Sequence, residues 1–95
     1  MAQAVRVIVY VPRELRKECG GASTLALTAA TVRELLCEVE RCHPPLYRCI
    51  CDETGAVRRH LNVFVNSMHL RDRQGLDTVL APGDEVVIIP AVSGG

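Results

Sequence analysis

Valine recurs at every second position of residues 5–11, which is the two-residue period of a β-strand that buries one face. Four valines of this stretch fall on one face, and Pro12 ends it. A polar loop over residues 13–21, closed by Gly20-Gly21, leads to a short apolar stretch over residues 23–27. The two stretches predict an opening β-hairpin.

Residues 57–66 contain the clearest alternation and predict a central strand. One face would carry Leu61, Val63 and Val65, and the other would carry His60, Asn62, Phe64 and Asn66. A short strand over 68–71 follows, and a Pro-Gly-Asp turn at 82–84 precedes an apolar closing strand over 85–90. We expect Phe64 and one alternate set of residues from the closing strand to form an exposed apolar patch, as at partner-docking surfaces.

One amphipathic helix begins at a capping box formed by Thr31 and Glu34. The Thr31 hydroxyl is expected to accept from the amide of Glu34, while the Glu34 side chain reaches back to the amide of Thr31. The apolar stripe of this helix consists of Val32, Leu35, Leu36 and Val39. Pro44-Pro45 end the helix near residue 42. Residues 46–51 fit a helical turn or a short strand, and residues 52–55 form a turn.

The predicted order is strand, strand, helix, strand, short strand, strand. One main helix then crosses one face of a mixed sheet, which is the pattern of the β-grasp (ubiquitin-like) fold in the α+β class. Ninety-five residues suffice for one domain. We expect the β-grasp domain to cover residues 1–90 and residues 91–95 to form a flexible C-terminal tail ending in Gly-Gly.

Charge and hydropathy exclude two classes of partner. Eleven basic and eleven acidic residues cancel and are scattered along the chain, so neither a nucleic-acid partner nor a membrane partner is expected. No apolar run approaches the roughly 20 residues of a membrane span, and the N-terminal residues do not read as a signal peptide, which favours a cytoplasmic location. Arg58-Arg59 and Arg71-x-Arg73 are short basic pairs, typical of a solvated surface, that a partner with an acidic rim would fit.

The five cysteines are an odd number, which suits reduced thiols better than a disulfide framework. Four of them lie with a histidine close enough in sequence for a zinc site to be considered: Cys37, Cys42, His43, Cys49 and Cys51. This group contains no Cys-x-x-Cys pair, so we expect no metal and interpret the cysteines as buried, hydrophobe-like thiols. The histidines have no partner at a catalytic spacing, and we expect no catalytic residue within the globular part.

The last residues carry the remaining chemistry. Ala-Val-Ser-Gly-Gly follows Pro90 and would reach roughly 16 Å when extended. Gly94 and Gly95 lack a Cβ atom and can pass a narrow channel into another protein. A carboxylate reacts only after activation, usually as an acyl-adenylate made from Mg-ATP by a partner enzyme. A frayed tail without a role is the alternative reading.

Several segments of the second half of the chain resemble one family. They are VRRHLNVFVN at 57–66, GLDTVL at 75–80, PGDE at 82–85 and IIPAVSGG at 88–95. Together they are similar to the ubiquitin-like sulfur carriers, which include the small subunit of molybdopterin synthase, the thiamin thiazole carrier and the carrier that feeds a cysteine synthase. The resemblance is closest to the cysteine-synthase type, and residues 57–95 carry nearly all of it.

The resemblance implies a carrier that partner enzymes act upon. An E1-like adenylyltransferase and sulfurtransferase would adenylate Gly95 with Mg-ATP and convert it to a thiocarboxylate, with Gly94 as the required neighbour and no cofactor bound permanently. The sulfur would pass to an accepting synthase, first of all of the cysteine-synthase type. The partner-binding residues would be Phe64, Pro90, Ala91, Val92 and Ser93.

Four other readings remain open at this point. The acceptor pathway can lead to molybdopterin, thiamin thiazole or a secondary metabolite. The chain can be a ubiquitin-like modifier that is joined to lysines of other proteins; Lys17 is its only lysine, which disfavours chains built on itself. The third and fourth readings are a noncatalytic interaction domain and a thiol or zinc module.

Overall fold

The computed structural model describes residues 3–91. The elements along the chain are β1 (Val5–Tyr10), the 3-10 helix η1 (Arg13–Cys19), β2 (Thr24–Ala29), α1 (Val32–Cys42), α2 (Pro44–Ile50), β3 (Leu61–Val65), β4 (Met68–His69), the 3-10 helices η2 (Leu70–Asp72) and η3 (Gly75–Asp77), and β5 (Glu85–Pro90). The expected flexible tail over 91–95 falls almost wholly outside the described residues, so the domain boundary stays a prediction.

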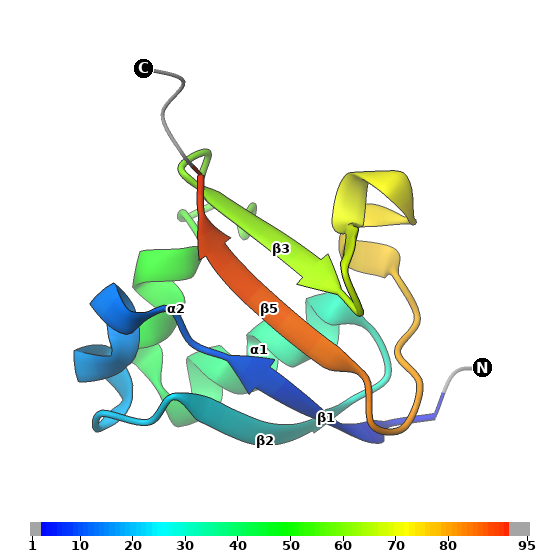
Figure 1. Ribbon diagram of the computed structural model, residues 1–95, viewed down its shortest axis with the longest axis horizontal. Coiled ribbons are helices and arrows are strands. Elements are labelled where there is room, and N and C mark those ends of the chain that lie inside the picture. The colour runs from blue at the N-terminus through cyan, green and yellow to red at the C-terminus, as the bar shows by residue number, and fades with distance from the viewer. Residues whose placement is uncertain (1–2, 92–95) are drawn as a thin grey trace.

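The five strands form one mixed sheet in the order β2-β1-β5-β3-β4. β1 and β5 run parallel in the centre, and the other neighbours are antiparallel. Helices α1 and α2 both lie on one face of the sheet, behind the strands in the view of Figure 1. This arrangement confirms the predicted β-grasp fold.

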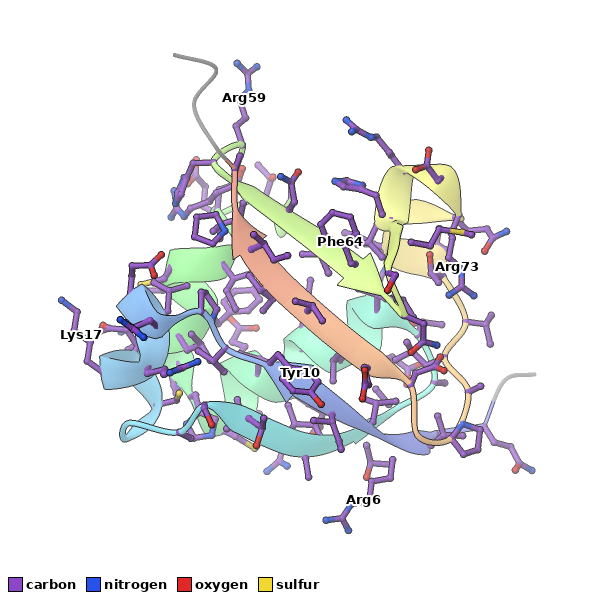
Figure 2. The ribbon with its side chains drawn as sticks, in the orientation of Figure 1. Arg6, Tyr10, Lys17, Arg59, Phe64 and Arg73 are labelled. Carbon is purple, nitrogen blue, oxygen red and sulfur yellow. The ribbon has the colours of Figure 1, made fainter. Side chains whose placement is uncertain are left out.

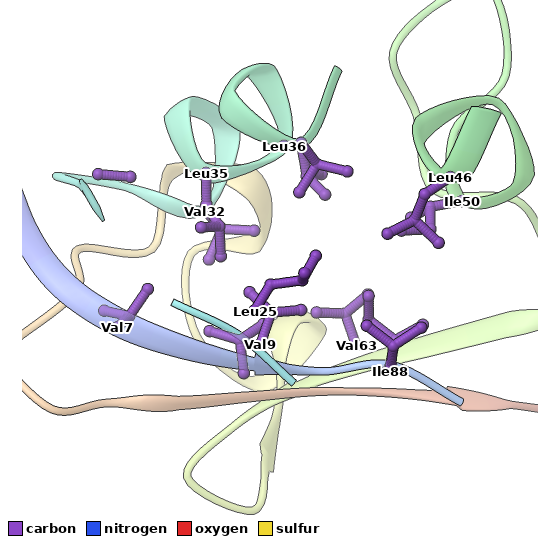
Figure 3. Close-up of a cluster of buried hydrophobic side chains, with 14 of the residues drawn as sticks. Val7, Val9, Leu25, Val32, Leu35, Leu36, Leu46, Ile50, Val63 and Ile88 are labelled. Atoms are coloured by element: carbon purple, nitrogen blue, oxygen red, sulfur yellow. The ribbon is translucent and has the colours of Figure 1, made fainter. Parts of the chain in front are cut away.

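The core lies between the sheet and the two helices (Figure 3). The strands contribute Val7, Val9, Val63 and Ile88, and the helices contribute Val32, Leu35, Leu36, Leu46 and Ile50, all of them buried. A fully buried side chain of this kind stabilises the fold by about 1.5–3 kcal/mol. The apolar stripe predicted for α1 is therefore the surface that holds this helix against the sheet.

The capping box predicted for the start of α1 is confirmed for Thr31 and wrong for Glu34. Thr31 Oγ1 accepts from the amide of Glu34 at 3.2 Å, as predicted. The Glu34 carboxylate accepts from the amide of Ala30 at 3.3 Å, one residue earlier than predicted. An isolated bridge between Thr31 and Val79 holds the chain at the start of this helix.

The segment that the sequence left ambiguous is a second helix. α2 begins at Pro44 directly after α1 ends at Cys42, and its two prolines occupy the first positions of the helix. Proline is tolerated there because the first amides of a helix have no intrahelical partner. Leu46 and Ile50, one helical turn apart, are both fully buried.

Three other boundaries differ from the sequence prediction. β3 begins at Leu61 and not at residue 57, because the chain before it folds back on α2: the amide of Arg58 donates to the carbonyl of Ile50 at 2.9 Å. The strand expected over 68–71 covers only Met68–His69 before η2 begins. The polar loop over 13–21 contains η1, and β2 covers Thr24–Ala29 where residues 23–27 were predicted.

Candidate functional site

The face of the sheet opposite the helices carries an apolar surface, which we call the open-face patch. It consists of Ile8, Tyr10, Phe64, Val87 and Ile89. Val87 lies in register with Tyr10 on one side and with Phe64 on the other, so these three side chains form a row across three strands. Figure 2 shows Tyr10 and Phe64 in front of the strands, on either side of β5.

The closing strand divides its apolar residues between the two faces as the alternation predicts. Val86 and Ile88 are 2% and 3% exposed and belong to the core, whereas Ile89 is 43% exposed on the open face. Ile8 on β1 is also exposed, at 37%. The predicted patch around Phe64 is therefore present, and these two isoleucines are its large aliphatic residues that are exposed to solvent.

Phe64 is half-buried because a neighbouring ring covers one of its edges. The His69 ring lies against it in a T-shaped arrangement, with 5.2 Å between the centroids and 79° between the planes. His69 Nε2 is 2.9 Å from Asn62 Oδ1, and its Nδ1 accepts from the amide of Arg71 at 3.1 Å. These partners assign the proton to Nε2 and hold the ring in place. Phe64 separates two shallow hollows, one toward His69 and one toward Ile89.

The end of the patch at the start of β5 is polar and tied together by hydrogen bonds. The Asn66 side chain donates to Asp84 at 2.7 Å and accepts from the amide of Glu85 at 2.9 Å, which joins the end of β3 to the start of β5. The Tyr10 hydroxyl donates to the Glu85 carboxylate at 3.2 Å. This hydrogen bond favours the neutral phenol and raises the pKa of Tyr10.

The C-terminal segment leaves the sheet at a fixed point beside this patch. β5 ends at Pro90, which lies opposite Leu61, and the amide of Ala91 donates to the carbonyl of His60 at 2.7 Å. Pro90 and Ala91, both predicted as partner contacts, are half-buried here. Ile89 of the open-face patch immediately precedes this exit. Figure 2 shows Arg59 at the same end of the sheet.

The predicted residues Val92, Ser93, Gly94 and Gly95 lie outside the described residues, so their roles stay predictions. What the structure describes is the surface from which they depart. The reactive group expected at Gly95 and the docking role expected of Phe64 both stay predictions.

A third hollow, with a largely apolar lining, lies beside β3, and we call it the basic hollow. Its apolar lining consists of Val57, Leu61, Val63, Leu70 and Leu76, and Arg58, Arg59 and Arg71 surround it. None of the described side chains that line it is acidic. In the sequence these arginines belong to two separate pairs; the short β3–β4 connection brings them together, which the spacing alone does not reveal.

The cysteines do not form one group. Cys19 and Cys51 are buried, as interpreted from the sequence, but Cys37 and Cys42 are exposed on α1 and Cys49 is half-buried. The interpretation as buried thiols was therefore wrong for the two on the outer side of α1. Burial raises the pKa of the Cys51 thiol to about 11.

Within residues 3–91, no three side chains of the kinds that bind metal ions come together. Over the same part of the chain, each helix is too short or too polar to cross a membrane.

The fold and the open face define the class of protein. It is a β-grasp protein in which β5, the last strand, ends beside an apolar surface of the sheet. A family model described as the ThiS family matches residues 9–95. The sulfur carrier protein CysO of Mycobacterium tuberculosis is 31% identical over 93 residues, which is 96% of this chain and 100% of the relative. The chain therefore belongs to the ThiS family, and its full-length curated relatives place it among the sulfur carrier proteins of that family.

Solved structures agree with this membership. A crystal structure of CysO from Mycobacterium tuberculosis has a TM-score of 0.84 at 31% identity, covering 90% of this chain and 99% of the other. The BexX/CysO complex of Amycolatopsis orientalis matches with a TM-score of 0.81 at 36% identity, covering 94% and 99%. The small archaeal modifier protein 1 of Methanosarcina acetivorans matches with a TM-score of 0.81 at 30% identity, covering 97% and 98%.

Proposed function

We propose that this chain carries sulfur as a thiocarboxylate on Gly95 and donates it to a biosynthetic enzyme. An E1-like enzyme uses Mg-ATP to adenylate Gly95: the carboxylate attacks the α-phosphate, and pyrophosphate leaves. Sulfide from a donor then attacks the carbonyl carbon, and AMP leaves. One oxygen of the carboxylate is thereby replaced by sulfur. All catalytic groups for these steps belong to the partner enzymes.

Donation uses the greater nucleophilicity of the new sulfur. It attacks an activated carbon held by the acceptor enzyme and forms a carbon–sulfur bond, and water then cleaves the acyl–sulfur bond. This last step returns the Gly95 carboxylate for another cycle. The acceptor proposed first is of the cysteine-synthase type, because curated relatives that match over nearly the full chain are CysO proteins.

One observation supports this proposal most strongly. The family match extends to residue 95 and so includes Gly94 and Gly95. At the end of the sheet, the amide of Ala91 donates a hydrogen bond to the carbonyl of His60. A partner that covers Ile89 and Phe64 on the open face therefore finds the C-terminal segment starting at a defined position at its rim. We propose the open-face patch as the docking surface for the activating enzyme and Pro90 and Ala91 as part of the same contact.

Intact mass spectrometry tests the charging step. The chain is incubated with Mg-ATP, a sulfide donor and a cognate activating enzyme, beside a variant that lacks Gly95. The proposal predicts the mass gain of one oxygen replaced by sulfur in the wild type and none in the variant. An unchanged wild-type mass, with an enzyme shown to charge its own carrier, would reject the proposal.

The similarity to the small archaeal modifier protein 1 supports a second candidate, a protein modifier. It would use the same adenylate but transfer the acyl group to a lysine amine of another protein. The two candidates differ in product: the modifier gives adducts in a cell lysate that survive thiols and denaturation and depend on Gly95. A lysate with charged carrier and no such adduct would leave only the sulfur carrier.

A further inference from the structure

β2 offers a long free edge for strand pairing. Of the strands formed by residues 3–91, β2 and β4 lie at the two ends of the sheet. β4 has only two residues and passes directly into η2, whereas β2 has six. Natural sheets keep such an edge from pairing with another chain by charges, proline or very short strands. The residues of β2 include neither a charge nor a proline.

The pairing with β1 determines which backbone groups of β2 point outward. The amide of Val11 donates to the carbonyl of Ser23 at 2.9 Å, which makes this a hydrogen-bonded pair. Because such pairs alternate along an antiparallel ladder, Leu25 and Leu27 also direct their backbone groups to β1. The N–H and C=O groups of Thr24, Ala26 and Thr28 therefore point to the free edge. Their side chains are all exposed.

The sequence of this edge reads the same in both directions. Residues 24–28 are Thr-Leu-Ala-Leu-Thr, with Ala26 at the centre. Antiparallel pairing of two such strands about a two-fold axis at Ala26 sets Thr opposite Thr, Leu opposite Leu and Ala opposite Ala. Cross-strand Thr–Thr pairs and paired aliphatic side chains both stabilise a sheet. The edge is thus complementary to itself, as a two-fold interface requires.

We propose that a second copy of this chain binds here, β2 against β2, in antiparallel register centred on Ala26. Thr24 of one copy then faces Thr28 of the other, and about six backbone hydrogen bonds join the two sheets into one. Leu27, half-buried in the single chain, gains cover from Leu25 of the other copy. A contact confined to one strand edge is smaller than the about 1,600 Å² of a standard interface, so the dimer is weak and forms at high concentration.

This dimer leaves the ends of both β5 strands uncovered. β1 separates β2 from β5, and the chain leaves the sheet at the end of β5 (Figure 1). Residues that face one another in a ladder share a face, so the two open-face patches lie on the same side of the joined sheet. The dimer therefore presents two docking surfaces and two carriers together.

Three variants and sedimentation velocity test the proposal without any partner enzyme. Thr24→Glu with Thr28→Glu sets like charges opposite each other twice in the dimer. Thr24→Lys with Thr28→Glu sets opposite charges there, but only in the antiparallel register. Ala56→Glu with Gln74→Glu is the control, because it adds the same charge as the first variant at exposed positions away from β2.

The wild type and the control are expected to pass from monomer to dimer between about 10 μM and about 1 mM, the range for so small a contact. The double-Glu variant should raise the dimer Kd at least about tenfold, and the Lys/Glu variant should restore it. A wild type that stays monomeric at the highest concentration overturns the proposal. That result is expected if β2 pairs with an extended segment of another protein and not with a second copy. A double-Glu variant that dimerises as the wild type does, or a Lys/Glu variant as weak as the double-Glu variant, overturns it as well.

Discussion

Ile89→Asp is the sharpest perturbation of the open-face patch. Ile89 is 43% exposed, and a fully buried isoleucine contributes about 1.5–3 kcal/mol, so a partner that covers it gains about 0.6–1.3 kcal/mol. An unpaired carboxylate forced under the partner costs a further about 1–3 kcal/mol. The two effects together raise the KM of the carrier about 15-fold or more.

The assay is the release of pyrophosphate by the activating enzyme as the carrier concentration is varied. Because Ile89 faces away from the core, the variant should keep its fold, which thermal unfolding checks. Val79→Asp is the matched control: Val79 is 53% exposed, and it lies outside the patch, in the bridge with Thr31. A fully folded Ile89→Asp variant with the KM of the wild type, or a control that is equally impaired, would refute the docking surface.

Three further predictions concern the fold and its titrating groups. Leu46→Ala removes a fully buried side chain of α2 and should lower the free energy of unfolding by about 2–5 kcal/mol in urea titration; a loss below about 1 kcal/mol would mean that α2 does not close the core. Glu85→Gln removes the carboxylate that accepts from the Tyr10 hydroxyl, so the pKa of Tyr10 should fall, as read by ultraviolet absorption; an unchanged titration would contradict the hydrogen bond. Cys51 should make the free energy of unfolding fall as pH rises from 9.0 toward about 11, because the unfolded thiol loses its proton near the lower pKa and the native thiol near the higher one; Cys51→Ala should lose this part of the pH dependence, and an identical dependence would contradict the burial of the thiol.

Those parts of the fold that depend on local periodicity could be predicted from the sequence. The alternation in β1 and β5 assigns each apolar residue to a face, and Val87 and Ile89 lie on the open face as the pattern requires. The stripe of α1 begins at the predicted cap. In both cases the signal lies within a few residues of the element that it specifies.

The rest depends on contacts that are distant in sequence. α2 has only two buried residues at helical spacing, Leu46 and Ile50, and so short a run does not distinguish a helix from a strand. Residues 57–60 were expected to belong to the same strand as 61–66, but the hydrogen bond of the Arg58 amide to the Ile50 carbonyl holds this segment against α2. Arg58, Arg59 and Arg71 line one hollow only because β3 pairs with β4, and the sequence alone does not show this pairing.

The most direct test of the carrier role follows one sulfur atom through a single turnover. The chain is charged with ³⁴S-labelled sulfide, separated from the activating enzyme, and mixed with a cysteine-synthase-type enzyme that holds its activated substrate. The account predicts that the label passes to the small-molecule product while the carrier returns to the mass of its free carboxylate. A carrier that keeps its label, in the presence of an acceptor enzyme shown to be active with another charged carrier, would contradict donation to this class of enzyme.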